Sequence, residues 1–126
     1  MLQILEQSPE AGTWPDVDFR EPRRCWVAER GGQVVGFLLA QCPIPEEAEI
    51  LALAVDPHVR RSGVAATLLR AFLEGRSGRV WLEVRASNTA ARRLYEGLGF
   101  VAGGVREGYY IAPPEDAIVM ELSCFQ

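Results

Sequence analysis

One stretch of the sequence combines two arginines, a glycine and the start of a helical pattern in a way that suits phosphate binding. Arg60 and Arg61 follow the strand-stopping pair Asp56-Pro57 and precede Gly63, after which small residues open the helical pattern. Exposed N–H groups at a helix start, together with the helix dipole, bind phosphate, and glycine lets the backbone approach it closely. Taken alone, an ordinary strand-to-helix turn with solvated arginines explains these residues equally well.

A second stretch carries a carboxylate, an amide and a phenol. Glu83 lies within 80–84, where apolar and other residues alternate as in a strand with two distinct faces. Asn88 is a good N-cap for a helix whose inner face would contain Tyr95. Without further information, Glu83 is better interpreted as a solvated carboxylate paired with Arg85. Tyr95 is then a core aromatic, and Asn88 is only a cap.

The elements that must position these residues alternate between strand and helix patterns. Residues 1–23 are the least regular part, and Ile4 and Leu5 are interpreted there as the end of a short helix. Strands are predicted over 25–29, 33–41, 49–55, 80–84, 101–110 and 117–122. Two helices are predicted, one from Gly63 with Val64, Leu68, Leu69, Phe72 and Leu73 on its apolar face, and one with Ala91, Leu94, Tyr95 and Leu98 inside. This order predicts an α/β fold with a mixed sheet.

Length and composition restrict the classes of function. The chain has 126 residues, which predicts a single domain over 1–126. A net charge of −4 argues against nucleic acid as the main partner. The residues Cys25, Cys42, Cys124 and His58 do not make a disulfide framework or a metal site. No segment has the apolar length to span a membrane, and the start carries acids where a signal peptide carries bases, so we expect a cytoplasmic protein.

Taken together, the phosphate turn and the run W-L-E-V-R-A-S-N-T-A-A-R-R-L-Y-E-G-L-G-F over 81–100 resemble the GNAT superfamily of N-acetyltransferases. Within it, they are most similar to the bacterial RimI-type enzymes, which acetylate the N-terminal alanine of ribosomal protein S18. The run R-E-G-Y-Y over 106–110 and E-D-A-I-V-M over 115–120 resemble the ending of that family. The likeness is detailed from about 51 to 122 and weak before residue 25.

The resemblance implies a GNAT fold, with a V-shaped splay between the strand ending at Val55 and the strand 80–84. It also implies that the chain lacks or shortens the family's first strand and first helix, an open edge that dimerisation would cover. Acetyl-CoA is the implied co-substrate, with no metal. The implied cofactor-binding residues are Leu53, Ala54 and Val55 for the pantetheine arm, Arg60, Arg61, Ser62, Gly63, Val64, Ala65 and Ala66 for the pyrophosphate, and Asn88. Where the family usually has G-x-G, this chain has Gly63-Val64-Ala65.

The resemblance also implies Glu83 as the proton acceptor and Tyr95 as the proton donor in direct acetyl transfer to an amine, most simply a protein N-terminal α-amine. Acetylation of a small-molecule amine or a lysine side chain is the alternative, because acceptor loops diverge while a CoA-binding core persists. A non-catalytic acyl-CoA-binding module is a third interpretation, against which the presence of both Glu83 and Tyr95 speaks. The pair Tyr109-Tyr110 is either edge-strand packing or a wall for the acceptor.

Overall fold

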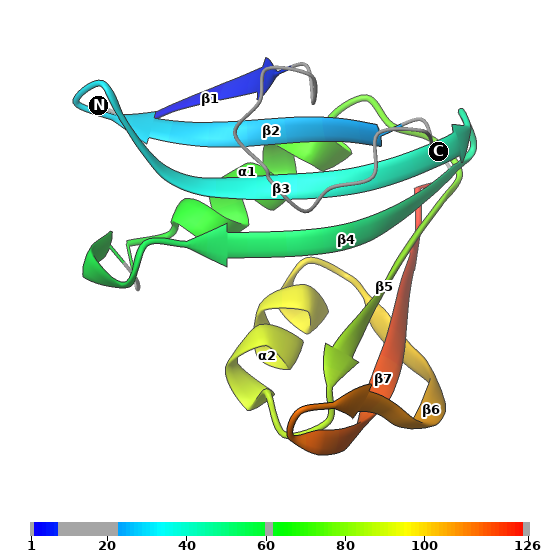
Figure 1. Ribbon diagram of the computed structural model, residues 1–126. Helices are drawn as coiled ribbons and strands as arrows, with labels where there is room; N and C mark the ends of the chain where they lie inside the picture. The colour runs from blue at the N-terminus through cyan, green and yellow to red at the C-terminus, as the bar shows by residue number, and fades with distance from the viewer. Residues whose placement is uncertain (1, 8–22, 60–61, 125–126) are drawn as a thin grey trace.

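The structure is a computed structural model that describes residues 2–7, 23–59 and 62–124. In these residues, seven strands form one mixed sheet in the order β1-β2-β3-β4-β5-β7-β6 (Figure 1). The elements along the chain are β1 (Leu2–Gln7), β2 (Arg23–Arg30), β3 (Gln33–Ile44), β4 (Glu47–Val55), the short 3-10 helix η2 (Pro57–Val59), α1 (Val64–Leu73), β5 (Arg79–Arg85), α2 (Thr89–Gly97), β6 (Val101–Ile111) and β7 (Pro114–Ser123).

The middle of the sheet splits open between β4 and β5. These two strands run parallel and pair only from Glu47 with Arg79 to Ile50 with Leu82. Leu51 is an extra residue in the β3–β4 ladder, because Leu39 faces Ala52 whereas the next residue of β3 faces Ile50. A bulge of this kind bends a strand and increases its twist. Beyond it, β4 and β5 diverge, which confirms the predicted V-shaped splay (Figure 1).

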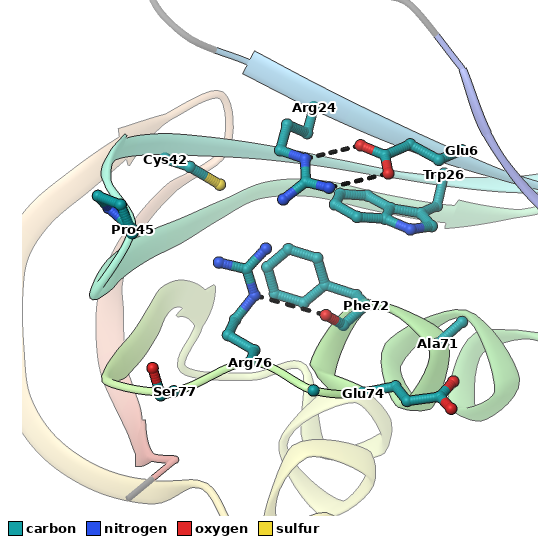
Figure 2. A pocket seen from close by; sticks show the side chains of 11 residues that line it. Glu6, Arg24, Trp26, Cys42, Pro45, Ala71, Phe72, Glu74, Arg76 and Ser77 are labelled. Carbon is teal, nitrogen blue, oxygen red and sulfur yellow. Dashed lines mark hydrogen bonds and ion pairs between the residues drawn. The ribbon is translucent and has the colours of Figure 1, made fainter.

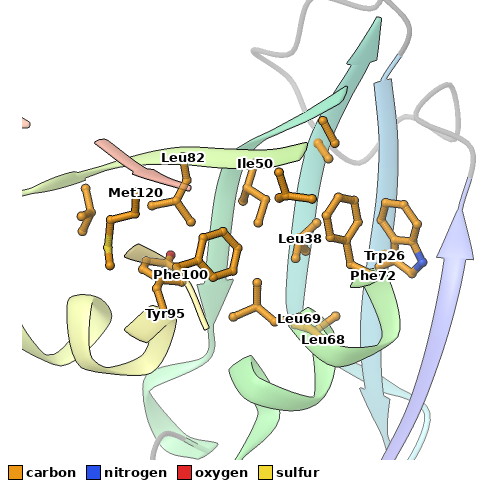
Figure 3. Packing of buried hydrophobic residues seen from close by; sticks show 14 of the residues in the cluster. Trp26, Leu38, Ile50, Leu68, Leu69, Phe72, Leu82, Tyr95, Phe100 and Met120 are labelled. Atoms are coloured by element: carbon orange, nitrogen blue, oxygen red, sulfur yellow. The ribbon is translucent and has the colours of Figure 1, made fainter. Parts of the chain in front are cut away.

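One apolar cluster joins the two helices to the sheet across this split (Figure 3). Helix α1 buries the predicted face, Val64, Leu68, Leu69 and Phe72, against β2, β3 and β4. The edge of the Phe72 ring meets Trp26 at 4.8 Å between centroids. On the other side of the split, the α2 residue Tyr95 packs with Phe100. The fold therefore has a continuous core beneath a sheet that is open at one end.

The beginning of the chain corrects one expectation. Residues 2–7 are not the end of a helix but the edge strand β1, which pairs antiparallel with β2 from Leu2 opposite Arg30 to Gln7 opposite Cys25. Leu2 and Ile4 pack against the core at a period of two, and this pairing covers the open edge of β2. The first strand is thus present, and the edge that motivated dimerisation is already paired. Residues 8–22, where the first helix would lie, fall outside the described residues.

The other elements follow the predicted pattern with small differences in length. Strand β3 continues through Pro43 to Ile44, where proline had been expected to end it. The ladder to β4 becomes irregular between Gln41 and Ile44, so Pro43 lies where regular pairing has lapsed. Within the described residues, no helix combines the length and the apolar character that crossing a membrane requires.

Candidate active site

The start of α1 presents backbone donors that have no hydrogen-bond partner among the described residues. Gly63 precedes the helix in the left-handed conformation, with φ of 81°, and offers no side-chain cap. The N–H of Thr67 donates to the Gly63 carbonyl at 3.0 Å. The hydrogen bonds of the helix therefore begin at Thr67, and the N–H groups of residues 64–66 take no part in them. A Cβ atom built on Gly63 would meet no heavy atom within 4 Å. This geometry fits an anion at the helix start, where the sequence predicts a pyrophosphate.

Hydrogen bonds fix the turn that leads into this helix. The Asp56 carboxylate accepts hydrogen bonds from the backbone N–H of His58 at 2.9 Å and from its ring at 3.0 Å, which hold the pKa of Asp56 below its usual range. The Ser62 hydroxyl donates to the Val59 carbonyl. Ser62 therefore serves the turn itself in this structure. Arg60 and Arg61, which the sequence places in the phosphate loop, lie outside the described residues.

Two adjoining pockets run from this helix start to the splay. The first, of about 340 Å³, is lined by Val55, Val59, Gly63, Val64, Ala65, Ala66, Ala90 and Leu94. The second, of about 280 Å³, lies between the diverging strands and is lined by Ile50, Leu51, Ala52, Leu53, Leu82, Glu83, Val84, Arg85, Asn88, Ala91, Tyr95 and Tyr110. Both are walled by β4 and α2, so together they form one path along these two elements.

Most of the predicted site residues meet in this path. Leu53 and Val55 share one face of β4, whereas Ala54 lies between them on the other face and is exposed, so only its backbone can take part. Beyond Ile50, the β4 edge that faces the splay has no partner strand in the described residues. Asn88 lines the second pocket and caps α2, because its Oδ1 accepts the Ala91 N–H at 3.1 Å.

Glu83 is a nearly enclosed carboxylate. Its side chain is 6% exposed, and Oε1 lies 3.6 Å from Nε of Arg106. Oε2 is buried and has no partner at full hydrogen-bond distance among the described residues, although the Tyr109 hydroxyl is near enough for Glu83 to contribute, after burial, to the raised pKa of Tyr109. The interpretation of Glu83 as a solvated carboxylate paired with Arg85 is therefore wrong, because Arg85 pairs with Glu115 instead. A buried carboxylate oxygen without a donor suits a group that receives a proton or a cation from a bound molecule.

Tyr95 lies across the second pocket, on α2. Its side chain is buried, with the ring packed against Phe100 at 5.8 Å between centroids. Burial, and to a lesser extent the neighbouring Tyr110, raises the pKa of Tyr95 to about 12. The phenol is thus neutral over the whole physiological range and retains its proton as a hydrogen-bond donor.

Comparison with known proteins assigns this arrangement to a family. The chain matches the acetyltransferase (GNAT) family over residues 3–100. This chain belongs to the GNAT family of acetyltransferases. It is 35% identical over 128 residues to the ribosomal protein bS18-alanine N-acetyltransferase of Escherichia coli, covering 94% of this chain and 86% of that protein. It is 38% identical over 117 residues to the N-alpha-acetyltransferase RimI of Mycobacterium tuberculosis, covering 85% and 73%.

Solved structures of GNAT enzymes show the same fold. The Escherichia coli ribosomal-protein-S18-alanine N-acetyltransferase superimposes with a TM-score of 0.85 at 29% identity, over 100% of this chain and 96% of that one. Ard1 from Thermoplasma volcanium superimposes with a TM-score of 0.80 at 29% identity, over 99% of each chain. The predicted GNAT fold is confirmed, and the chain is an acetyl-CoA-dependent transferase by family.

One further carboxylate lies near Glu83, and the sequence analysis did not single it out. Glu49 on β4 pairs in register with Trp81, two residues before Glu83 on the same face of β5. Burial, and then the negative charge of Glu83, raises the pKa of Glu49. The sequence signal that could have identified Glu49 is an acidic residue at the start of an otherwise apolar predicted strand. Its proximity to Glu83 depends on the β4–β5 register, which the sequence does not display.

Glu49→Gln is expected to stabilise the protein at neutral pH. Because the pKa of Glu49 is raised on folding, its ionisation opposes the folded state. The stability tied to this group is present below the ordinary carboxyl range and is lost as pH rises through the raised pKa. Thermal melts from about pH 4 to pH 8 should show the variant gaining over wild type as pH rises. Glu47→Gln, at an exposed position two residues earlier on the same face of the strand, is the control; an equal gain there would refute the assignment.

A separate hollow of about 430 Å³ lies between β2, β3 and the end of α1 (Figure 2). Arg24 donates to Glu6 through Nε at 2.6 Å and Nη2 at 2.8 Å, and its guanidinium lies 4.9 Å from the centre of the Trp26 ring. Arg76 lies over the Phe72 ring at 4.3 Å and donates to the Phe72 carbonyl at 3.4 Å. Through these contacts, Arg24 and Arg76 cover the Trp26 and Phe72 rings at this end of the core, and we assign the hollow no chemistry.

Proposed function

We propose that this GNAT enzyme transfers the acetyl group of acetyl-CoA directly to the α-amine of a protein N-terminus. The observation that carries the proposal is the second pocket, which brings the carboxylate of Glu83 and the phenol of Tyr95 to one hollow from β5 and α2. By their names, one of the two relatives acetylates an alanine of ribosomal protein bS18 and the other is an N-alpha-acetyltransferase. Two features of this chain, the enclosed acid Glu83 and the neutral phenol of Tyr95, are the groups that such a transfer requires.

The two pockets along β4 and α2 offer backbone donors that suit acetyl-CoA. The N–H groups of Val64, Ala65 and Ala66 at the start of α1 would hold the pyrophosphate, with the space in front of Gly63 left clear. The unpaired edge of β4 from Leu53 to Val55 offers backbone groups to the amides of the pantetheine arm. Acetyl-CoA supplies the activated thioester, and the backbone and side chains of this chain would bind it and handle the protons.

The acidic pair is suited to accept a proton from the incoming ammonium group. Glu83 and Glu49 stand on neighbouring strands, and the charge of Glu83 contributes to the raised pKa of Glu49. Two neighbouring carboxylates resist being ionised together, which adds to the effect of burial on the pKa of Glu49. We propose Glu83 as the proton acceptor, directly or through a water molecule, with Glu49 increasing the negative potential that draws the ammonium group in.

Tyr95 is suited to stabilise the departing thiolate. An ordinary thiol titrates near pH 8.5, so complete proton transfer from a phenol of pKa about 12 would be uphill by about 5 kcal/mol. Donation of a hydrogen bond carries no such penalty and is strongest when negative charge develops on the sulfur. We therefore propose that Tyr95 donates a hydrogen bond as the C–S bond breaks, and that its proton moves only in concert with the proton released by the amine.

An acceptor panel tests the proposed function. At pH 7, roughly a tenth of an α-amine is neutral, against fewer than about one in a thousand lysine side chains. We expect thiol release with a peptide that has a free N-terminus and no lysine to be about 10²-fold faster than with the N-terminally blocked peptide carrying one lysine. Small amines form the third arm. A preference for lysine or a small amine would replace the N-terminal acceptor while leaving the GNAT assignment intact.

A further inference from the structure

The guanidinium group of Arg85 contacts several groups on and beside the turn between β6 and β7. Its Nη1 donates to the Pro113 carbonyl at 2.8 Å and its Nη2 to the Ala112 carbonyl at 3.2 Å. Nη1 also lies 3.4 Å from the Glu115 carboxylate. The guanidinium lies over the Tyr110 ring, 4.2 Å from its centre. One side chain at the end of β5 thus holds the turn between β6 and β7 at several points and supports an aromatic ring beside it.

The same turn is fastened to the residues that lead into α2. The Ser87 N–H donates to the Glu115 carboxylate. Hydrogen bonding by Ser87, first through its side chain and then through its backbone, and the nearby Arg85 hold the pKa of Glu115 below its usual range. The Ala86 N–H donates to the Asp116 carbonyl at 3.1 Å. The Asp116 carboxylate accepts the Gly108 N–H at 2.9 Å and so ties β6 to the turn. Arg85 and Glu115 therefore form the junction of three segments: the end of β5, the approach to α2 and the β6–β7 turn.

This junction ends at the pocket where the chemistry is proposed. Tyr110 and Arg85 both line it, together with Glu83 and Tyr95. The pKa of Tyr95 is sensitive to Tyr110, so the two phenols lie near one another. A displaced Tyr110 ring would widen the pocket on the side away from β4, because nothing else described in the pocket comes from β6. The residue that fixes this ring fixes the shape of that wall.

We propose that Arg85 is a positioning residue that locks the β6–β7 turn and the Tyr110 ring into a rigid wall for the acceptor amine. The inference rests on the proposed function, since it assigns this wall to the acceptor rather than to acetyl-CoA. A planar guanidinium can bond two carbonyl groups, meet a carboxylate and stack on a ring at once, whereas a lysine ammonium cannot reproduce this fork. Arg85 should therefore not be replaceable by lysine.

Kinetics of Arg85→Lys and Arg85→Gln test the proposal. We expect both to lower kcat/KM for the acceptor peptide by about 10-fold or more, through a raised acceptor KM, because about 1.4 kcal/mol of positioning is lost. The Kd for acetyl-CoA, measured by calorimetry, should stay within twofold. The control is Arg79→Lys on the same strand, where Arg79 pairs with Glu121 at 2.8 Å outside the pocket; it should change neither constant. Full activity of Arg85→Lys, or an equal loss of acetyl-CoA affinity, would overturn the proposal.

Two further measurements separate this inference from the proposed function. Amide exchange at Ala86, Ser87 and Gly108 reports the docking of the turn without any transfer reaction, and it should accelerate at least tenfold in Arg85→Gln but not in Arg79→Lys. Unchanged exchange would refute the junction even if the enzyme acetylates peptides. Adding Tyr110→Leu to Arg85→Gln should add little to the kinetic defect, because both act on one wall; independent, multiplying effects would also refute it. If amide exchange accelerates in Arg85→Gln but the wild-type enzyme acetylates no peptide, only the assignment of this wall to the acceptor is refuted.

Discussion

Glu83→Gln is expected to lower turnover by about 10²–10⁴-fold, the usual loss when a general base is removed. Glutamine preserves the size of a side chain that is 6% exposed, and its neutral amide cannot take a proton from the amine. The base must be ionised to act, so the fall in wild-type rate toward acid pH should weaken in the variant. Initial rates of thiol release across pH, at saturating acetyl-CoA, measure both effects.

Tyr95→Phe addresses the other half of the same mechanism. The ring packed against Phe100 is retained, so folding and acetyl-CoA affinity should persist while turnover falls about 10²-fold through the lost hydrogen bond to the thiolate. The matched control for Glu83→Gln is Glu121→Gln, the same carboxylate-to-amide change at an ion pair with Arg79, and it should leave the rate unchanged. A double variant of Glu83→Gln and Tyr95→Phe with near-normal turnover, or an isolable acetyl-cysteine intermediate, would disprove the mechanism.

Gly63→Val is expected to weaken acetyl-CoA binding by about 10²-fold or more, because two effects add. A β-branched residue with φ of 81° is strained, which costs about 1–3 kcal/mol. Its methyl groups would also occupy the open space before the α1 N–H groups, which the pyrophosphate needs. Isothermal titration calorimetry with acetyl-CoA gives the affinity directly.

Gly75→Val carries the backbone strain without the second effect, so the difference between the two variants measures the second effect. Gly75 follows the other end of α1 with φ of 70°, and its Cβ position is also open, so valine there brings similar strain without approaching the proposed pyrophosphate site. We expect it to lower the melting temperature about as much as Gly63→Val while leaving the Kd for acetyl-CoA within threefold. Normal binding by Gly63→Val, or equal loss in both variants, would show that the loop assignment is wrong.

The sequence predicted those parts of the fold whose pattern is local. Helix α1 has an apolar stripe that ends near Gly75, and buried and less buried residues alternate strictly in β5. The period of each element can therefore be recognised from its own residues. Residues 2–7 are too few to show a period, because the adjacent pair Ile4-Leu5 fits a helix end as well as a strand. What decided their structure was the free edge of β2, which is a property of the assembled sheet.

The candidate site divides in the same way. Glu83, Asn88 and Tyr95 lie within one continuous motif, so the likeness to GNAT enzymes located them together. Glu49 is distant from that motif in the chain, and only the parallel register of β4 with β5 places it beside Glu83. Arg85 was misassigned to Glu83 because the two share a strand face at a spacing of two. The competing partners, on the β6–β7 turn, lie about thirty residues later and are brought near by β7.

The short parallel seam between β4 and β5 also has a consequence for how the chain assembles. Strands β1 to β4 meet through antiparallel neighbours, most of them close in sequence, whereas β5 reaches β4 only after the whole α1 crossover has folded back. Strand β7 must then insert between β5 and β6, a contact of high sequence separation. The seam thus divides the sheet, though not the core, into two units that the backbone joins over a few residue pairs. The path proposed for acetyl-CoA has one wall on β4 and the other on α2, on opposite sides of this seam. Bound acetyl-CoA would therefore connect the two units of the sheet, which the backbone pairs over only a short length.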